Sequence, residues 1–393
     1  MFAGAAIGVS HLVQSTRAGA DFGLGLLWAL VLIHIVKYPF FQFGPRYATA
    51  TGESLLDGYQ KLGKGVLIAY LIVNLATMFT IQAAVTIVTA GLASSLFGIT
   101  ANPVIWSIII TIICFLILII GRYKLLDNLM KLIVIILTIS TITALIVATV
   151  NNSESYSFAQ ILPKNSIEIS FLIAFLGWMP APLDVSIWQS LWAIEKKKEK
   201  SIKFTTKQAI FDFNIGYIST LLIGAFFLIL GALVMYHSTT KFSVNSVDFA
   251  KQLISLYTNN LGANTYIFIA AAAFTTMFST TLTTLDASPR AMTKTFELLS
   301  IKTKKFSYWF WISFLAVGTI SILTFFMSEM GLLVKIATIL SFLTAPFFAI
   351  LNFILISGKH TPKKWRPSLP LKIASWFGIL FLIAFSGWYL FSL

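Results

Sequence analysis

The stretch Gly177-Trp178-Met179-Pro180-Ala181-Pro182 interrupts an apolar segment that spans residues 167–192. A segment of this length and apolarity predicts a membrane-spanning helix, which needs about 20 residues. Proline has no backbone N–H, so Pro180 and Pro182 each remove an intrahelical hydrogen bond and argue against continuous helix here. The sequence therefore predicts a helix that is broken inside the membrane. The structural alternative is a kink that neighbouring helices satisfy.

A second interruption, Gly8-Val9-Ser10-His11, lies in the first apolar segment, residues 2–20. Interrupted helices at matching positions in two halves of a chain are the best sequence indicator of a transporter site. The two breaks are five apolar segments apart. Because five is odd, equivalent helices of the two halves cross the membrane in opposite directions, so the second half is inverted relative to the first. We therefore predict an inverted-repeat secondary transporter, with its substrate site between the breaks.

Apolar segments fill the rest of the 393-residue chain, of which 58% is apolar and only 11% charged. This composition excludes a soluble globular protein, and the segments lack the alternation of a β-barrel. We predict an all-α integral membrane protein with one transmembrane domain, 1–393. Its inverted repeats cover about 1–150 and 167–357. The eleven predicted helices are 2–20, 24–50, 64–97, 102–121, 128–150, 167–192, 208–236, 264–290, 306–328, 331–357 and an extra helix at 370–391.

The distribution of Lys and Arg among the loops indicates how the chain is oriented in the membrane. With the N-terminus in the cytoplasm, 22 of the 28 Lys and Arg residues fall in inside loops and four in outside loops. This bias predicts an N-in, C-out protein of the cytoplasmic (plasma) membrane. The net charge of +14 then indicates contact with anionic lipids of the inner leaflet, and not nucleic acid binding.

Several function classes find no support in the sequence. It has no GxxxxGK[ST] loop for ATP, no TVGYG-like potassium filter, and no HExxH or GxSxG motif for catalysis. The single cysteine, Cys114, excludes an intramolecular disulfide. We therefore predict neither an enzyme nor a resident cofactor. Only seven residues precede Gly8, which favours initiation upstream of Met1.

The chain resembles the natural-resistance-associated macrophage protein (Nramp) family of proton-coupled divalent metal transporters over essentially its whole length. The motifs that carry the resemblance are Gly19-Ala20-Asp21-Phe22-Gly23 with Leu26-Leu27-Trp28, Ala50-Thr51-Gly52-Glu53, Gly121-Arg122-Tyr123, Met179-Pro180, and Ala345-Pro346-Phe347 within 341–348. The resemblance implies a five-plus-five fold of the APC-superfamily type with broken helices 1 and 6, plus one extra helix, and a substrate site between those two helices.

The departures from the family lie where it binds its metal. The DPGN positions of the family's first helix correspond here to Gly8, Val9, Ser10 and His11, so its Asp and Asn are replaced by Gly8 and His11. The MPH motif keeps Met179 and Pro180 but ends in Ala181, and a family Gln in helix 10 corresponds to Thr338. The acidic positions of helix 3 are Leu75, Gln82 and Val85, which cannot relay a proton.

The predicted substrate site comprises Gly8, Val9, Ser10, His11, Leu176, Met179, Pro180, Ala181 and Thr338. The resemblance implies symport of a divalent metal ion. His11 and Met179 would offer a nitrogen and a thioether, a softer pair than the oxygen ligands of Mn²⁺ or Mg²⁺. The alternative is a small, amino-acid-like organic solute whose anionic group faces the half-helix N-termini. Coupling to a proton or another ion stays open, and loss of the helix 3 acids favours a proton-independent mode.

Other ionisable residues inside the spans are candidates for coupling or gating, because a charge in the membrane is costly unless it has a role. Asp184 is the one carboxylate near the second break, and either replaces the missing anion or pairs with a cation elsewhere. Residues His34 and Lys37 share a helix face and form either a structural pair or part of an aqueous vestibule. Asp286 with Arg290 has the i, i+4 spacing of a salt bridge or gate. Gln82 completes this set. Ser and Thr residues at 275–284 either line a path or pack against a neighbouring helix.

Overall fold

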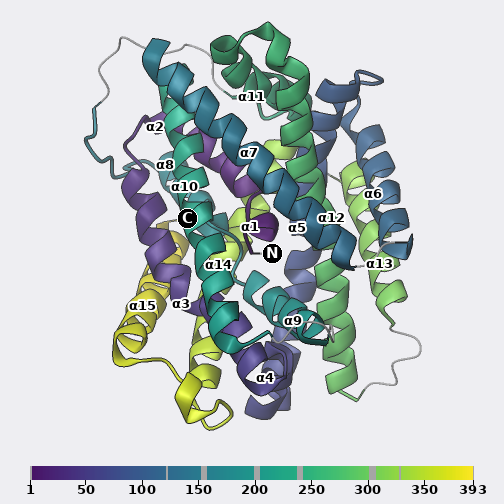
Figure 1. Ribbon diagram of the computed structural model, residues 1–393, viewed down its shortest axis with the longest axis vertical. Helices are drawn as coiled ribbons and strands as arrows, with labels where there is room; N and C mark the ends of the chain where they lie inside the picture. Colours follow the sequence, from purple (N-terminus) through teal and green to yellow (C-terminus); the bar gives the residue numbers. More distant parts are fainter. Residues whose placement is uncertain are drawn as a thin grey trace.

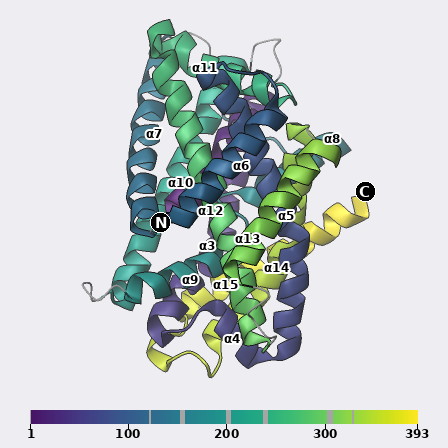
Figure 2. The same cartoon turned by 90° about the vertical axis from the view of Figure 1, so that its right-hand side faces the viewer.

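The computed structural model describes residues 2–120, 123–151, 157–198, 204–236, 242–300, 307–326 and 329–392. These residues form a helical bundle without a strand, in which long helices lie side by side along the longest axis (Figures 1 and 2). In chain order the α-helices are α1 (Phe2–Ala6), α2 (Thr16–Phe22), α3 (Leu27–Thr51), α4 (Leu55–Leu62), α5 (Lys64–Phe97), α6 (Pro103–Ile120), α7 (Tyr123–Asn151), α8 (Ser166–Trp178), α9 (Val185–Lys198), α10 (Thr206–Met235), α11 (Ser246–Leu261), α12 (Tyr266–Leu298), α13 (Tyr308–Ser321), α14 (Met330–Ser357) and α15 (Leu369–Ser392).

In the described part of the chain, helices occupy all eleven predicted spans, and two of these spans are interrupted. By length and composition, α3, α5, α10, α12, α13, α14 and α15 can each cross a membrane, while α6, α7 and α8 contain shorter apolar helices. Large apolar side chains such as Ile72, Ile139 and Phe377 are exposed on the outer faces of the bundle. Such exposure is expected where the solvent is lipid. Among the residues of the resemblance, Gly121 and Arg122 lie outside the described ranges.

The first and sixth spans are broken as predicted. The first consists of α1, a bend, a π-helical turn at Ser10–Ser15 and then α2. The sixth consists of α8 and α9, separated by non-helical residues 179–184. The third residue of each break, Ser10 and Met179 respectively, is buried, so both breaks lie inside the protein.

Two helices of the structure were not among the predicted spans. Helix α4 has eight residues and α11 has sixteen, and both carry polar as well as apolar residues. Helix α4 begins with a capping box, in which the Ser54 side chain accepts from the Asp57 backbone N–H and the Asp57 side chain accepts from Ser54 N–H. Figure 1 shows α4 and α11 at opposite ends of the bundle.

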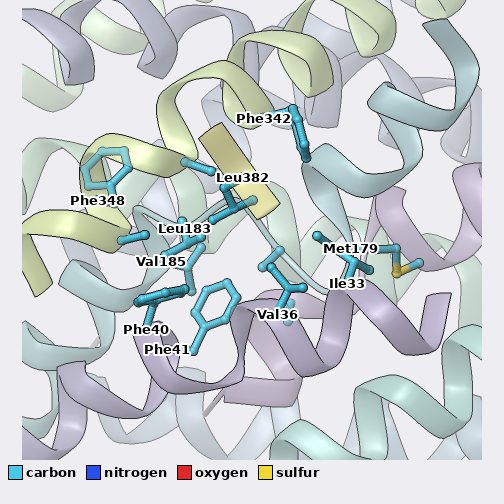
Figure 3. Close-up of a cluster of buried hydrophobic side chains, with 14 of the residues drawn as sticks. Ile33, Val36, Phe40, Phe41, Met179, Leu183, Val185, Phe342, Phe348 and Leu382 are labelled. Atoms are coloured by element: carbon cyan, nitrogen blue, oxygen red, sulfur yellow. The ribbon is translucent and has the colours of Figure 1, made fainter. Parts of the chain in front are cut away.

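Helix α3 packs closely against its neighbours at two glycines. A Cβ atom on Gly44 would lie 2.3 Å from the Ser186 carbonyl oxygen of α9, and one on Gly378 of α15 would lie 2.6 Å from the Val36 carbonyl oxygen. Only a residue without a side chain allows backbones to approach this closely. Around these contacts, Phe40, Phe41 and Leu183 belong to a buried apolar cluster next to the second break (Figure 3).

Candidate functional site

The first break brings the Ile7 carbonyl into contact with α12. The Thr280 hydroxyl donates to the Ile7 carbonyl at 3.2 Å, and a Cβ atom on Gly8 would lie 2.7 Å from the same hydroxyl oxygen. Glycine at position 8 therefore lets the chain bend directly beneath Thr280. This threonine belongs to the Ser/Thr-rich stretch of α12, residues 275–284, for which the sequence left open whether it lines a path or packs against a neighbouring helix.

The second break leaves carbonyls at the end of α8 without helical partners, because the helix stops at Trp178. Met179 has extended backbone angles (φ −82°, ψ 129°), and helix resumes at Val185. The carbonyl oxygens of two predicted site residues, Leu176 and Ala181, both accept hydrogen bonds from one side chain of α3.

That side chain is Lys37, which is fully buried. Its Nζ donates to the carbonyl oxygens of Leu176 (2.8 Å), Gly177 (2.7 Å) and Ala181 (3.2 Å). An ammonium group has three N–H donors, so these three bonds satisfy it completely. A lone lysine inside an apolar span was a visible signal, but its partners are about 140 residues away in the sequence.

The two breaks are joined by Ser10. Its hydroxyl oxygen lies 3.2 Å from the carbonyl oxygens of Ala6 and Pro180 and 2.8 Å from His11 Nδ1. The single hydroxyl hydrogen can be donated to only one of these three groups at a time. Residues Ser10 and Pro180 were both predicted to belong to the site, and the structure brings them into contact.

Both ring nitrogens of His11 are engaged. Nε2 lies 3.1 Å from the Thr220 carbonyl oxygen, which only accepts, so this nitrogen carries a proton. In a neutral imidazole, Nδ1 then accepts from Ser10. Ligation of a metal by His11 would require one of these two bonds to break.

His11 and Met179 approach the same residue of α10. A Cβ atom on Gly224 would lie 3.6 Å from His11 Cδ2 and 3.7 Å from Met179 Cε. Both side chains are fully buried. Within the described part of the chain, no group of three or more His, Cys, Asp or Glu side chains could hold a metal ion.

A small cavity of about 30 Å³ lies between the breaks. Its lining includes Gly8, Val9 and Ser10 from the first break, Pro182 from the second, Trp188 from α9, and Thr280 and Thr284 from α12. Six predicted site residues are absent from the described lining, namely His11, Leu176, Met179, Pro180, Ala181 and Thr338. The Thr338 hydroxyl instead donates to the Val334 carbonyl within α14 at 2.7 Å. The polar side chains of the lining therefore supply mainly neutral oxygen atoms.

Gln82 binds to α12 next to this cavity. Its side-chain oxygen accepts from the Thr284 hydroxyl at 2.6 Å, and its Nε2 lies 3.3 Å from the Thr281 carbonyl oxygen. Thr89 on α5 also contacts Thr281, hydroxyl to hydroxyl, at 2.8 Å. The Ser/Thr-rich part of α12 thus has both of the roles considered above. Thr281 packs against α5, while Thr280 and Thr284 line the cavity.

Asp184 and His34 are buried, and each has one polar side-chain atom that makes no hydrogen bond. Asp184 Oδ1 and His34 Nε2 have no hydrogen-bond partner. The carboxylate of Asp184 attracts the ammonium group of Lys37 electrostatically. The other ring nitrogen of His34 bonds to the Leu30 carbonyl at 2.7 Å, so His34 and Lys37 have separate partners although they share a helix face.

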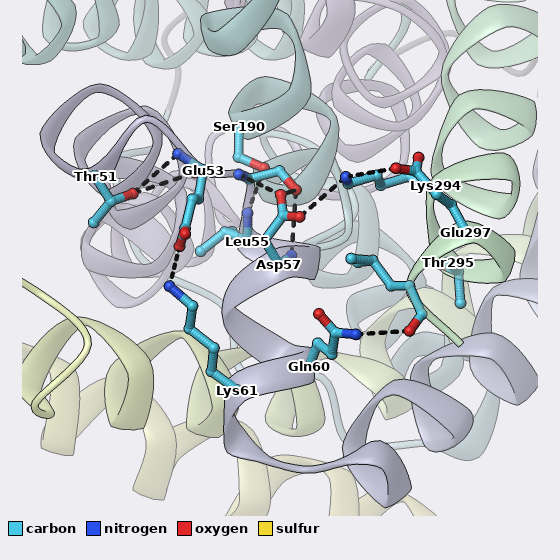
Figure 4. Close-up of polar contacts among 12 residues, drawn as sticks. Thr51, Glu53, Leu55, Asp57, Gln60, Lys61, Ser190, Lys294, Thr295 and Glu297 are labelled. Atoms are coloured by element: carbon cyan, nitrogen blue, oxygen red, sulfur yellow. Dashed lines mark hydrogen bonds and ion pairs between the residues drawn. The ribbon is translucent and has the colours of Figure 1, made fainter. Parts of the chain in front are cut away.

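The predicted pair of Asp286 and Arg290 forms an ion pair. Arg290 Nε lies 2.8 and 2.7 Å from the two carboxylate oxygens, and the Tyr308 hydroxyl donates to Asp286 at 2.7 Å. Arg290 and Tyr308 also line a larger cavity of about 500 Å³, which opens between α4, α9 and α12. This cavity contains Asp57 and Lys294, which bridge α4 and α12 at 3.0 Å (Figure 4).

The chain matches a protein-family model along almost its whole length. A family model described as "Natural resistance-associated macrophage protein-like" matches residues 1–392. An uncharacterized protein of Pasteurella multocida (strain Pm70) is 34% identical over 398 residues, which cover 99% of this chain and 92% of that protein.

Solved structures show the same fold at low identity. A mutant of the Eremococcus coleocola manganese transporter matches with a TM-score of 0.74 and 13% identity, covering 98% of this chain and 83% of that one. The complex of that transporter with an aromatic bis-isothiourea substituted compound gives 0.70 and 14%, with the same coverage. Mhp1, a nucleobase-cation-symport-1 family transporter with bromovinylhydantoin bound, gives 0.64 and 13%, covering 99% of this chain and 91% of that one.

Proposed function

Because the chain belongs to the Nramp-like family, we propose that it carries a divalent metal ion of the Mn²⁺ type through the cavity between its two broken helices. It is an integral membrane secondary transporter with the five-plus-five inverted-repeat fold, and not an enzyme. The family match and the manganese transporter structures do not favour the organic-solute alternative.

The observation that carries the proposal is the position of this cavity. Helix breaks from both repeats line it, and alternating access requires a substrate site that both repeats share. Ser10, Thr280 and Thr284 contribute hydroxyl oxygens, the ligand type that hard divalent ions prefer. Without a carboxylate in contact, an ion keeps part of its water shell, so we expect weak binding and rapid release.

Ligation by His11 and Met179 stays a separate prediction. The same holds for gating by Asp184, His34, Gln82, Asp286 and Arg290. Gln82 cannot carry a proton, so we propose transport that does not depend on a proton gradient. The repeat boundaries near 150 and 167 also remain proposals.

We further propose the cytoplasmic membrane as the location, with the N-terminus inside and the C-terminus outside. Cations gather on the loops that this orientation places inside, where anionic lipids attract them. Lys61 on α4 and Lys363 after α14 are two of these cations. Membrane lipids are thus expected partners.

Metal uptake into proteoliposomes tests the proposed substrate. Wild-type protein is expected to admit Mn²⁺, and Thr280→Val, which removes a hydroxyl with little change in shape, to reduce kcat/KM by about 10-fold or more. That factor corresponds to about 1.4 kcal/mol. Lys335→Ala on α14, an exposed position in a span, is the matched control and should transport as wild type does.

The same vesicles separate the two substrate classes. Flux of Mn²⁺, Fe²⁺, Zn²⁺ and Mg²⁺ is measured with a metal-sensitive dye, with and without a pH gradient. Failure to move any of these metals, together with uptake of a radiolabelled amino acid, would overturn the metal proposal. A strict requirement for the pH gradient would overturn the proton-independent mode alone.

A further inference from the structure

The ammonium group of Lys37 occupies the place of a coordinated ion. Its three bonds go to the carbonyls of Leu176, Gly177 and Ala181, which all belong to the end of α8 or to the break that follows it. Carbonyl oxygens in such an arrangement replace the water shell of an alkali ion. The C-terminal end of a helix also carries a partial negative charge, which favours a cation there.

Unwound carbonyls and half-helix C-terminal ends are the groups that coordinate coupling ions in transporters with broken helices. In this protein the cation at that position is the ammonium group of Lys37, and not an ion from solution. The Lys37 side chain is fully buried, and the nearby Asp184, itself only 4% exposed, keeps one carboxylate oxygen without a hydrogen-bond partner. The cage thus has three neutral oxygen ligands, and the carboxyl group of Asp184 interacts electrostatically with the ammonium group that the cage holds.

We propose that these groups form a monovalent-cation site which Lys37 fills internally. The protein therefore needs no alkali ion from solution at this position, and removal of the lysine side chain opens the cage to Na⁺ or K⁺. This inference concerns the coupling ion and does not depend on which substrate is transported.

Thermal unfolding of purified protein tests the proposal without any transport assay. Wild type, Lys37→Ala and Lys335→Ala are compared in NaCl, KCl and choline chloride at equal ionic strength. Lys37→Ala should unfold several degrees higher in Na⁺ or K⁺ than in choline, because an ion that binds only the folded state stabilises it. Wild type and Lys335→Ala, whose Lys37 fills the cage, should show no such difference.

A second variant guards against loss of folding. Lys37→Ser also opens the cage and keeps a small polar group. Both variants are produced in cells rich in K⁺, so each should fold if the site accepts an alkali ion. Failure of both to fold, or folded variants that respond equally to choline and alkali ions, would overturn the proposal. Failure of metal uptake in vesicles would leave these outcomes unchanged.

Discussion

The burial of His11 is explained by hydrogen bonds at both ring nitrogens. We expect His11→Ala to lower the free energy of unfolding by about 1–3 kcal/mol, because the buried Thr220 carbonyl and the Ser10 hydroxyl each lose a partner. Thermal unfolding of the purified variant measures this loss.

Calorimetric titration then separates structure from ligation at this residue. If His11 is held by hydrogen bonds, folded His11→Ala keeps the saturable heat of Mn²⁺ binding. Loss of that heat in both His11→Ala and Met179→Ala would instead establish the soft-ligand pair that the sequence suggests.

The sequence was informative about which residues matter and less so about what they contact. Ser10 and Lys37 are polar residues in apolar segments, and for that reason alone they stand out. Their partners, Pro180 and the carbonyls at the end of α8, are more than 130 residues away. Helical periodicity describes only neighbours along one helix, so it could not predict these contacts.

At the scale of helices, the bridge between α4 and α12 should respond to acid. Burial alone would raise the pKa of Asp57, but hydrogen bonds from Ser54 and Lys294 lower it below its ordinary value of 3.8. A lowered pKa means that the stabilisation is complete above the unfolded value and is lost as the pH falls through the folded one. Asp57→Asn should therefore unfold at a lower temperature than wild type at pH 7, and the difference should shrink near pH 3.5.

Asp212→Asn on α10 is the matched control for this prediction. The Asp212 carboxylate is 56% exposed and lies 3.5 Å from Lys196, so solvent screens the pair and its loss should change little. An equal effect of both substitutions at pH 7 would contradict the assignment of the bridge as the stabilising element.

Helices that span the membrane were predictable because length and apolarity suffice to identify them. Helix α4 escaped this criterion, since its eight residues include Asp57 and Lys61. The spacing of Ser54 and Asp57 nonetheless matches a capping box and could have marked its start. Helix α11, with Asn245 as its N-cap, carries a similar local signal.

For the whole molecule, the distribution of cations predicts which end of the bundle faces the cytoplasm. Single cysteines at Lys61 on α4 and Lys251 on α11 should react with a membrane-impermeant maleimide from opposite sides in intact cells. Only the cysteine at 251 is expected to react before the cells are opened. Native Cys114 is fully buried, and Cys114→Ala provides the background. The reverse pattern would refute the N-in orientation.

The close contacts of α3 also restrict how the molecule can move. Gly44 holds α3 against α9, Gly378 holds α15 against α3, and Lys37 fastens α3 to α8. Asn352 of α14 adds bonds to both the Phe40 carbonyl and the Ser186 hydroxyl. The five helices, α3, α8, α9, α14 and α15, come from both repeats and from the extra helix, and these contacts hold them together as one unit. We therefore expect the transport cycle to move α12 relative to these five helices, and we expect the Asp57–Lys294 bridge, which ties α12 to α4, to restrain that movement.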